Sequence, residues 1–360
     1  MATVKLDDVA CEVRESWKAD RAGVPVVGLE HLEPDEIWLR HWDVNPDENT
    51  FSKGFKMGQL LFGRRRAYQK KMSIAPCDGI CSGDITVIAA KPEKILPELL
   101  PFYLRTDAFF DFAMRGSGGS LSPRVKWSHI AGYEFDLPPL DEQRKLADLL
   151  WAANDLKEKY KKAIAATDEM LKAKFREMFG ECGVQSAESG VRLEDVVDVM
   201  DDKREPLNDA VRSTMKEGYL YPYYGANGVV DYINKYLTDD TLLCIAEDCG
   251  AYGPGEDSAY IIRGKSWVNN HAHLVKPKEG CCLIEFLQVQ FRIADLRSYI
   301  SGTTRQKLTQ SKLRSIMCVC PPLALQQQFV EIARKADETK AALKKSINDV
   351  EQVIKGLING

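Results

Sequence analysis

The chain contains two copies of one unit. Matching segments recur in the same order, each copy lying between about 187 and 183 residues after the first. The matches are VKLDDV at 4–9 with VRLEDV at 191–196, KP at 91–92 with KP at 276–277, and PPL at 138–140 with PPL at 321–323, where the last pair is followed by Gln143 and Gln326. A repeat of this length far exceeds a solenoid unit. The sequence therefore predicts two domains, each with the same appendage.

The appendage is predicted to be a long helix. After Pro139 and again after Pro322, apolar residues alternate in steps of three and four, which is the heptad pattern of a helical seam. Acidic residues at 141 and 142 favour a helix start, Gly180 favours a stop, and about 40 residues would span roughly 60 Å. The predicted seam residues are Leu146, Leu149, Ala153, Leu156, Tyr160, Ala163, Thr167 and Met170, then Phe329, Ile332, Ala336, Thr339, Leu343, Ser346 or Ile347, Val350, Val353 and Leu357.

The two helices are expected to pair. Each could instead pack on its own domain, but a domain of about 130 residues offers too little surface for so long a helix. We expect an antiparallel coiled coil with a domain at each end. The predicted boundaries are globular domains at 1–137 and 181–320, with long helices at 138–180 and 321–360.

The globular portions are predicted to be α/β, in the mixed α+β sense. Strand-like runs lie at 59–62, 84–89, 241–246 and 272–275. Asn227-Gly228 is a hairpin signal between two potential strands. Helical segments near 96–114 and 283–300 are each followed by a loop rich in glycine, serine or threonine.

The composition is that of a folded protein, with 44% hydrophobic and 28% charged residues. No apolar run reaches the roughly 20 residues of a membrane span, and residues 1–20 lack a signal-peptide core. Cysteines mixed with apolar residues suggest buried thiols, so we expect a reduced, cytoplasmic setting. The net charge of −4 argues mildly against DNA binding and requires local basic patches.

The search for catalytic motifs is largely negative. There is no methyltransferase Asn-Pro-Pro-Tyr motif, and Gly264-Lys265-Ser266 lacks the first glycine of a phosphate-binding loop. His271 and His273, with Cys281 and Cys282 nearby, could bind a metal. A structural role, with one histidine bonding the backbone and the other packing, is favoured. We therefore expect no catalytic residues, no metal and no cofactor on this chain.

Two kinds of basic segment are candidates for contact with nucleic acid. Residues 63–71 place five cations around Tyr68, and loops at 115–124 and 301–307 combine cations with small residues. Such segments can neutralise phosphates and reach base edges, although a solvated turn or a flexible loop would explain them too. The candidate DNA contacts are Arg64, Arg65, Arg66, Lys70 and Arg124 in the first copy, and Thr303, Thr304, Arg305, Gln306 and Lys307 in the second.

The junctions between domain and helix resemble a known family. FDLPPLDEQRKLA at 135–147 is similar to the entry to the conserved helix of type I restriction-modification specificity subunits, and PPLALQQQF at 321–329 matches less closely. YPYYGAN at 221–227, with Gly228, and WVNNHAH at 267–273 resemble segments of that family's recognition domains.

The resemblance implies a function for both parts of the chain. Each domain would read one half of an asymmetric, interrupted site on double-stranded DNA. The helices would set the gap and dock two modification subunits, and a restriction or translocase subunit can join. S-adenosylmethionine, ATP and Mg would belong to those partners, whose methyltransferase flips an adenine out of the duplex.

Three alternatives stay open at this point. A nuclease could use Asp35, Asp47 and Glu48, and would cut DNA with magnesium. A coiled-coil adaptor without DNA contact would lack salt-dependent retention on DNA. Within the favoured interpretation, the complex could carry modification alone.

Overall fold

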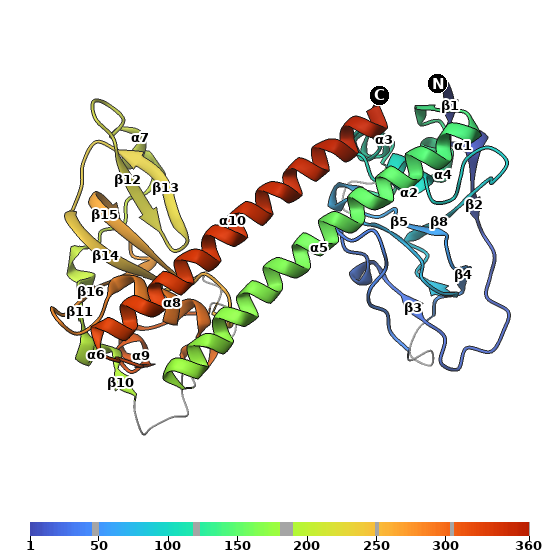
Figure 1. The fold of residues 1–360 in the computed structure, drawn as a ribbon. Helices are drawn as coiled ribbons and strands as arrows, with labels where there is room; N and C mark the ends of the chain where they lie inside the picture. The colour runs from blue at the N-terminus through green and yellow to red at the C-terminus, as the bar shows by residue number, and fades with distance from the viewer. Residues whose placement is uncertain (45–49, 118–122, 181–189, 249–251, 303–305, 360) are drawn as a thin grey trace. The chain divides into compact units, whose positions relative to one another are not determined.

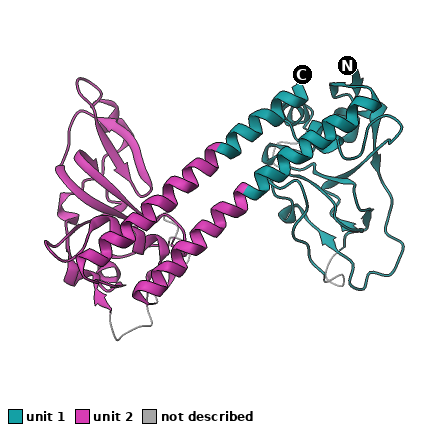
Figure 2. Ribbon diagram, viewed as in Figure 1, with its two compact units in different colours: residues 1–159, 346–360 teal, residues 160–345 magenta. Residues whose placement is uncertain are grey.

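The computed structural model describes residues 1–44, 50–117, 123–180, 190–248, 252–302 and 306–359. The chain divides into two compact units, residues 1–159 with 346–360 and residues 160–345 (Figure 2). Both units combine helices with sheets (Figure 1), which confirms the predicted mixed class. Within the described ranges, no helix is both long enough and apolar enough to cross a membrane.

Within its described residues, the first unit contains three small sheets. β1 (Ala2–Lys5) pairs antiparallel with β9 (Glu134–Leu137). The four-stranded sheet has the order β2 (Ala10–Val13), β8 (Ile85–Ala90), β5 (Leu60–Gly63), β6 (Met72–Ile74), and the three-stranded sheet has the order β3 (Val26–Val27), β7 (Gly79–Cys81), β4 (Lys53–Phe55). The helices are α1 (Leu6–Val9), α2 (Leu100–Leu104), α3 (Asp107–Arg115) and α4 (Trp127–Ile130), with short 3₁₀ helices at Leu29–His31 and Ala67–Gln69.

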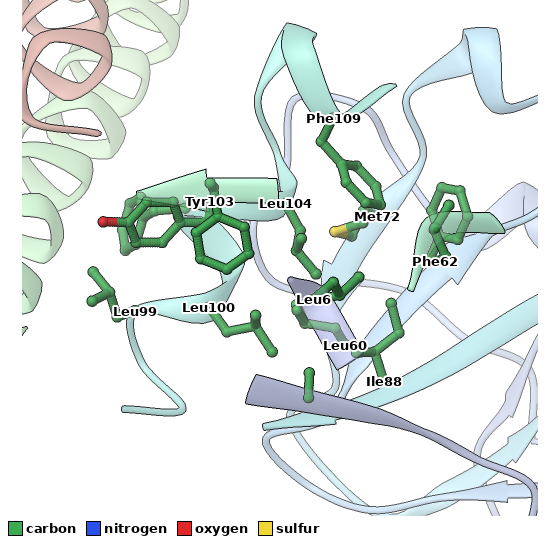
Figure 3. Close-up of a cluster of buried hydrophobic side chains, with 14 of the residues drawn as sticks. Leu6, Leu60, Phe62, Met72, Ile88, Leu99, Leu100, Tyr103, Leu104 and Phe109 are labelled. Carbon is green, nitrogen blue, oxygen red and sulfur yellow. The ribbon is translucent and has the colours of Figure 1, made fainter. Parts of the chain in front are cut away.

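Strand β5 lies in the middle of the first unit. Leu60 and Phe62 point to one face of the sheet, where Leu104 and Phe109 of the helices cover them (Figure 3). Leu61 points to the opposite face and belongs to a second buried cluster. Successive side chains alternate across a strand, so this strand is buried on both faces. Because the strand is held on both sides, the residues that follow Gly63 begin at a fixed position.

The second unit is built on one larger sheet. Its order is β11 (Val197–Val199), β16 (Ala272–Pro277), β14 (Thr238–Ala246), β15 (Ala259–Val268), β12 (Tyr221–Gly225), β13 (Gly228–Ile233), and β10 (Val191–Arg192) pairs with β17 (Met317–Cys318). The helices are α6 (Leu193–Val196), α7 (Asp209–Ser213), α8 (Ile284–Ile293) and α9 (Gln310–Arg314), with 3₁₀ helices at Asp201–Lys203 and Arg297–Tyr299.

The predicted strand runs are confirmed, most within one or two residues of the observed bounds. The Asn-Gly hairpin is also confirmed, because β12 and β13 pair antiparallel across Gly225 and Gly228. Gly228 has a φ of 117°, a conformation that side-chain-bearing residues rarely adopt. The turn could therefore be predicted from the sequence, because glycine is the residue that tolerates a positive φ.

Two long helices follow the two globular portions, as predicted. They are α5 (Leu140–Phe179) and α10 (Leu323–Asn359), and they pack together as a coiled coil. Each helix changes unit part-way along (Figure 2). In the first unit Lys157 Nζ lies 3.6 Å from Glu351 Oε1, and in the second Lys340 Nζ lies 2.8 Å from Asp168 Oδ1. Later residues of α5 meet earlier residues of α10, so the pair is antiparallel.

The predicted seam of α5 is out of phase by one residue. Leu149, Leu156 and Met170 are exposed, whereas the buried positions are Ala147, Leu150, Leu171 and Phe175. The spacing of three and four is right. The phase was wrong because polar residues occupy seam positions, among them Gln143 and Asn154, which are both buried. For α10, Phe329 and Ala336 are buried as predicted, while Ala333 is buried in place of Ile332 and Val353 is exposed.

The duplication is confirmed by equivalent hydrogen bonds at the two helix starts. Gln143 Oε1 accepts from the Leu96 amide at 2.9 Å, and its amide donates to the carbonyls of Lys94 and Pro138. Gln326 makes the matching bonds to the Leu283 amide at 2.8 Å and to the carbonyls of Cys281 and Pro321. Both glutamines are buried. The same polar joint therefore fastens each helix to its domain.

One landmark of the repeat needs correction. The amide of Lys91 donates to Val9 O at 2.7 Å, and the amide of Lys278 donates to Val196 O at 2.9 Å. Lys91 Nζ also bonds the carbonyl of Asp7, and Lys278 Nζ bonds that of Glu194. The structural counterpart of Lys91 is therefore Lys278, not Lys276, because the Lys-Pro match lies two residues off the true alignment.

The buried glutamine joint can be tested by truncation. Gln326→Ala removes the partner of the Leu283 amide and of the Pro321 carbonyl and one of two partners of the Cys281 carbonyl, and each group left unsatisfied costs about 1–3 kcal/mol. We expect the free energy of unfolding, measured by denaturant titration, to fall by at least that amount. Gln327→Ala on the exposed neighbour should change it by less than about 0.5 kcal/mol. Equal losses in the two variants would contradict a special role for Gln326.

Candidate nucleic-acid interface

The basic segment and the loop that follows α3 meet in the first unit. Beyond Gly63 the chain runs antiparallel to the end of that loop, with Arg65 bridged to Arg124. The Val125 amide donates to Arg64 O at 2.8 Å, and the Arg66 amide donates to Pro123 O at 3.1 Å. Residues 64–66 and 123–125, about 60 residues apart in the sequence, thus form one surface at the end of β5.

An acidic residue holds this surface together. Arg124 makes a two-bond contact with Asp84, with Nε at 2.6 Å from Oδ1 and Nη2 at 3.3 Å from Oδ2. Arg65 Nη1 lies 3.6 Å from the same carboxylate. The hydrogen bond from Arg124 lowers the pKa of the Asp84 carboxyl, and Asp84 in turn raises the pKa of the Arg124 guanidinium. Both ions therefore stay charged near neutral pH.

The remaining cations of the basic segment point in different directions. Arg66 is exposed in a left-handed conformation, with a φ of 54°, and forms no ion pair with any described residue. Arg64 Nε is buried and has no hydrogen-bond partner among the described residues. Lys70 also has a positive φ, of 52°, and its Nζ lies 2.6 Å from Asp107 Oδ1. Lys71 Nζ bonds the carbonyl of Leu29, so only part of the segment faces solvent.

The second unit has a corresponding surface at the end of β14. Asp248 is bridged to Lys307, and the Leu308 amide donates to Glu247 O at 2.7 Å. Lys307 Nζ lies 2.7 Å from Glu247 Oε1. Burial alone would raise the pKa of the Glu247 carboxyl, but hydrogen bonds from Lys307 and Arg204 lower it overall. Gln306 is exposed, and the candidates Thr303, Thr304 and Arg305 lie outside the described residues.

The two histidines differ from the expected pair. His273 is buried, with Nε2 at 2.8 Å from Leu308 O and Nδ1 at 2.7 Å from Asp201 Oδ2, so it does bond the backbone as predicted. The expectation that the other histidine packs was wrong. His271 reaches outward, and its Nδ1 lies 2.8 Å from Asp248 Oδ1. Within the described ranges, no group of three potential ligands is placed to hold a metal ion.

Buried charges support the base of the second surface. Arg204 bonds Glu247 and lies 2.9 Å from Asp201 Oδ2, and Gln310 donates to the same oxygen at 2.9 Å. Sequence reasoning missed Asp84, Asp201, Arg204 and Glu247. Asp84 could have been noticed in the sequence, because it is a lone acidic residue at the start of the predicted strand at 84–89. Asp201 and Arg204 are only three residues apart, but their other partners, Glu247 and His273, lie far away in the sequence.

The rejected motifs have structural explanations. Lys265 lies within β15, and its Nζ sits 5.0 Å from the ring centre of Tyr236 and 6.0 Å from that of Tyr221. It is therefore part of a strand and not of a phosphate-binding loop. Of the acidic residues weighed for a nuclease, Asp47 and Glu48 lie outside the described residues.

Part of the chain is similar to known proteins. Residues 189–352 match the type I restriction modification DNA specificity domain. A Haemophilus influenzae protein named as a type I restriction enzyme specificity subunit is 33% identical over 140 residues, which cover 39% of this chain and 35% of that protein. The match thus spans only about a third of the relative's length.

Solved structures share the fold over nearly the whole chain. A chain from a study of complex assembly and conformational transition of the type I restriction-modification system has a TM-score of 0.58 and 18% identity, covering 99% of this chain and 96% of that one. A type I system S subunit from M. genitalium has a TM-score of 0.54 and 12% identity, covering 99% and 95%. Residues 189–352 are thus similar to the DNA specificity domain of type I restriction-modification systems, and nearly the whole chain shares the fold of the two solved structures.

Proposed function

We propose that this chain reads a two-part sequence on double-stranded DNA, one half with each unit. The supporting observation is that the same surface is built twice, where a central strand ends beside a loop that carries cations. Half-exposed arginine, lysine and histidine side chains on these surfaces suit phosphates and base edges. Because the side chains differ between the units, the two half-sites would differ, and the whole site would be asymmetric.

The long helices would act as spacer and docking surface. Their facing seams hold the pair together, and several apolar side chains lie off the seam and exposed, among them Leu149, Leu156, Met170 and Val353. Exposed apolar side chains on a helix suit a protein partner. We propose that two modification subunits dock there, and that a restriction or translocase subunit joins in a complete system.

The chain itself would be non-catalytic and would work in the cytoplasm. Adenine methylation, with S-adenosylmethionine, would belong to the modification subunits, and ATP and Mg would belong to the partners. This assignment is supported by the absence of a recognisable catalytic motif in the sequence.

The first prediction concerns methylation in the source cell. A genome-wide map of N6-methyladenine, made with and without this gene, should lose methylation at one asymmetric two-part motif. The lost motif would give both half-sites. Unchanged methylation would contradict a role in directing a working methyltransferase.

The second prediction concerns the spacer. Lys340 pairs with Asp168, so residues 163–169 of α5 face residues 339–345 of α10. Deleting both segments removes one heptad from each helix and should shorten the gap between half-sites by about 10 Å, or about three base pairs, without altering the half-sites. The same methylation map measures the outcome. Changed half-sites with an unchanged gap would contradict the spacer role.

The third prediction concerns Arg65. Arg65→Ala should weaken binding to the methylated motif by about 1–3 kcal/mol and relax preference at one half-site, as measured by titration with duplex DNA. Arg14→Ala removes an exposed arginine of the same unit that pairs with Glu12, and it serves as the control. If Arg65→Ala retained both affinity and preference, the first surface would not be the contact.

A further inference from the structure

The two candidate surfaces correspond residue by residue. The Arg64 amide donates to Asp84 O and the Glu247 amide donates to His271 O, both at 2.9 Å. The bridges of Arg65 to Arg124 and of Asp248 to Lys307 complete the match. Arg64, Arg65, Asp84 and Arg124 of the first unit therefore occupy the places of Glu247, Asp248, His271 and Lys307 in the second.

The charges at these places are exchanged. In the first unit the second residue after strand β5 is basic, Arg65, and the facing turn supplies the acidic residue, Asp84. In the second unit the second residue after strand β14 is acidic, Asp248, and the facing turn supplies the basic residue, His271. The contact has been kept while its polarity has been reversed. Both units therefore have an acidic and a basic side chain paired at the same two backbone positions, although the residues differ.

The acid is the inner partner in both units. Asp84 is 20% exposed, whereas Arg65 and Arg124 are 38% and 46% exposed. Asp248 is 16% exposed and its partner His271 is 48% exposed. Glu247 is 10% exposed beneath Lys307, which is 50% exposed. Each surface thus presents half-exposed basic side chains to solvent, and a less exposed carboxylate pairs with them.

We propose that these inner carboxylates are positioning residues for DNA reading, a role that rests on the proposed function. Asp84 would orient Arg65 and Arg124 toward the first half-site. Asp248 and Glu247 would orient His271 and Lys307 toward the second. A long basic side chain loses rotamer freedom when it contacts a base edge, and a side chain already held in one geometry loses less.

This role makes an unusual prediction. A carboxylate near DNA repels phosphates, so its neutralisation ordinarily strengthens binding to any sequence. If Asp84 positions the arginines, Asp84→Asn should instead weaken binding to the correct motif by about tenfold or more, the loss typical of a misplaced base contact. Binding to DNA without the motif should stay equal or become tighter.

The experiment uses the complex purified through a tag on this chain. Dissociation constants are measured for duplexes carrying the motif from the methylation map, the motif with either half-site altered, and neither half-site. Asp84→Asn should lose discrimination at one half-site only, and Asp248→Asn at the other. Asp78→Asn is the matched control, because Asp78 pairs with Lys56 at 2.8 Å elsewhere in the first unit. It should leave discrimination at both half-sites intact.

Each outcome bears on a different claim. A wild-type complex that shows no preference for the motif contradicts the proposed function itself. A wild-type complex with preference, but an Asp84→Asn variant that behaves like Asp78→Asn or binds all duplexes more tightly, overturns the positioning role alone.

A second variant covers the case in which Asp84→Asn fails to fold, as judged by its melting temperature. Arg124→Lys keeps the positive charge but cannot make the two-bond contact with Asp84. It should lose discrimination at the first half-site while the dependence of affinity on salt stays unchanged. Wild-type discrimination in this variant would also overturn the proposal.

Discussion

A single buried glutamine at the start of each long helix is the joint on which the architecture depends. Gln143 and Gln326 each satisfy one backbone amide and two carbonyls, so the helix leaves its domain in a defined direction. Buried polar groups are costly unless they are paired, and a fully satisfied set specifies one arrangement. The repeated proline pair before each glutamine fits the same role, since proline has no amide hydrogen to donate and restricts the preceding backbone.

The coiled coil that begins at these joints is unusual in its seam. Gln143, Asn154, Lys157, Asp168 and Lys340 occupy or border positions that a simple coiled coil fills with apolar side chains. Polar seam residues cost stability but fix which residues face each other. In the proposed spacer role, a unique register would matter more than a small further gain in the free energy of unfolding.

Much of the fold could be predicted from the sequence, because repeats, heptads and turn residues act over short stretches. The junction segments were recognisable for the same reason. The phase of α5 was not, since polar seam residues such as Asn154 gave no apolar signal. For the candidate site, the cations were found but their partners were not. Asp84 lies 40 residues before Arg124, and Asp201 lies 72 residues before His273, so only the tertiary fold shows these pairs.

The first unit is completed by residues 346–360, with Ile354, Leu357 and Ile358 packed on its core. A ribosome makes this segment only after it has made the whole second unit. The first unit therefore lacks these side chains on its core until residues 160–345 have been made, whereas domains otherwise tend to fold one by one from the N-terminus. Loss of the last turns of α10 would accordingly uncover the core of the first unit, while the second unit would keep all of its residues.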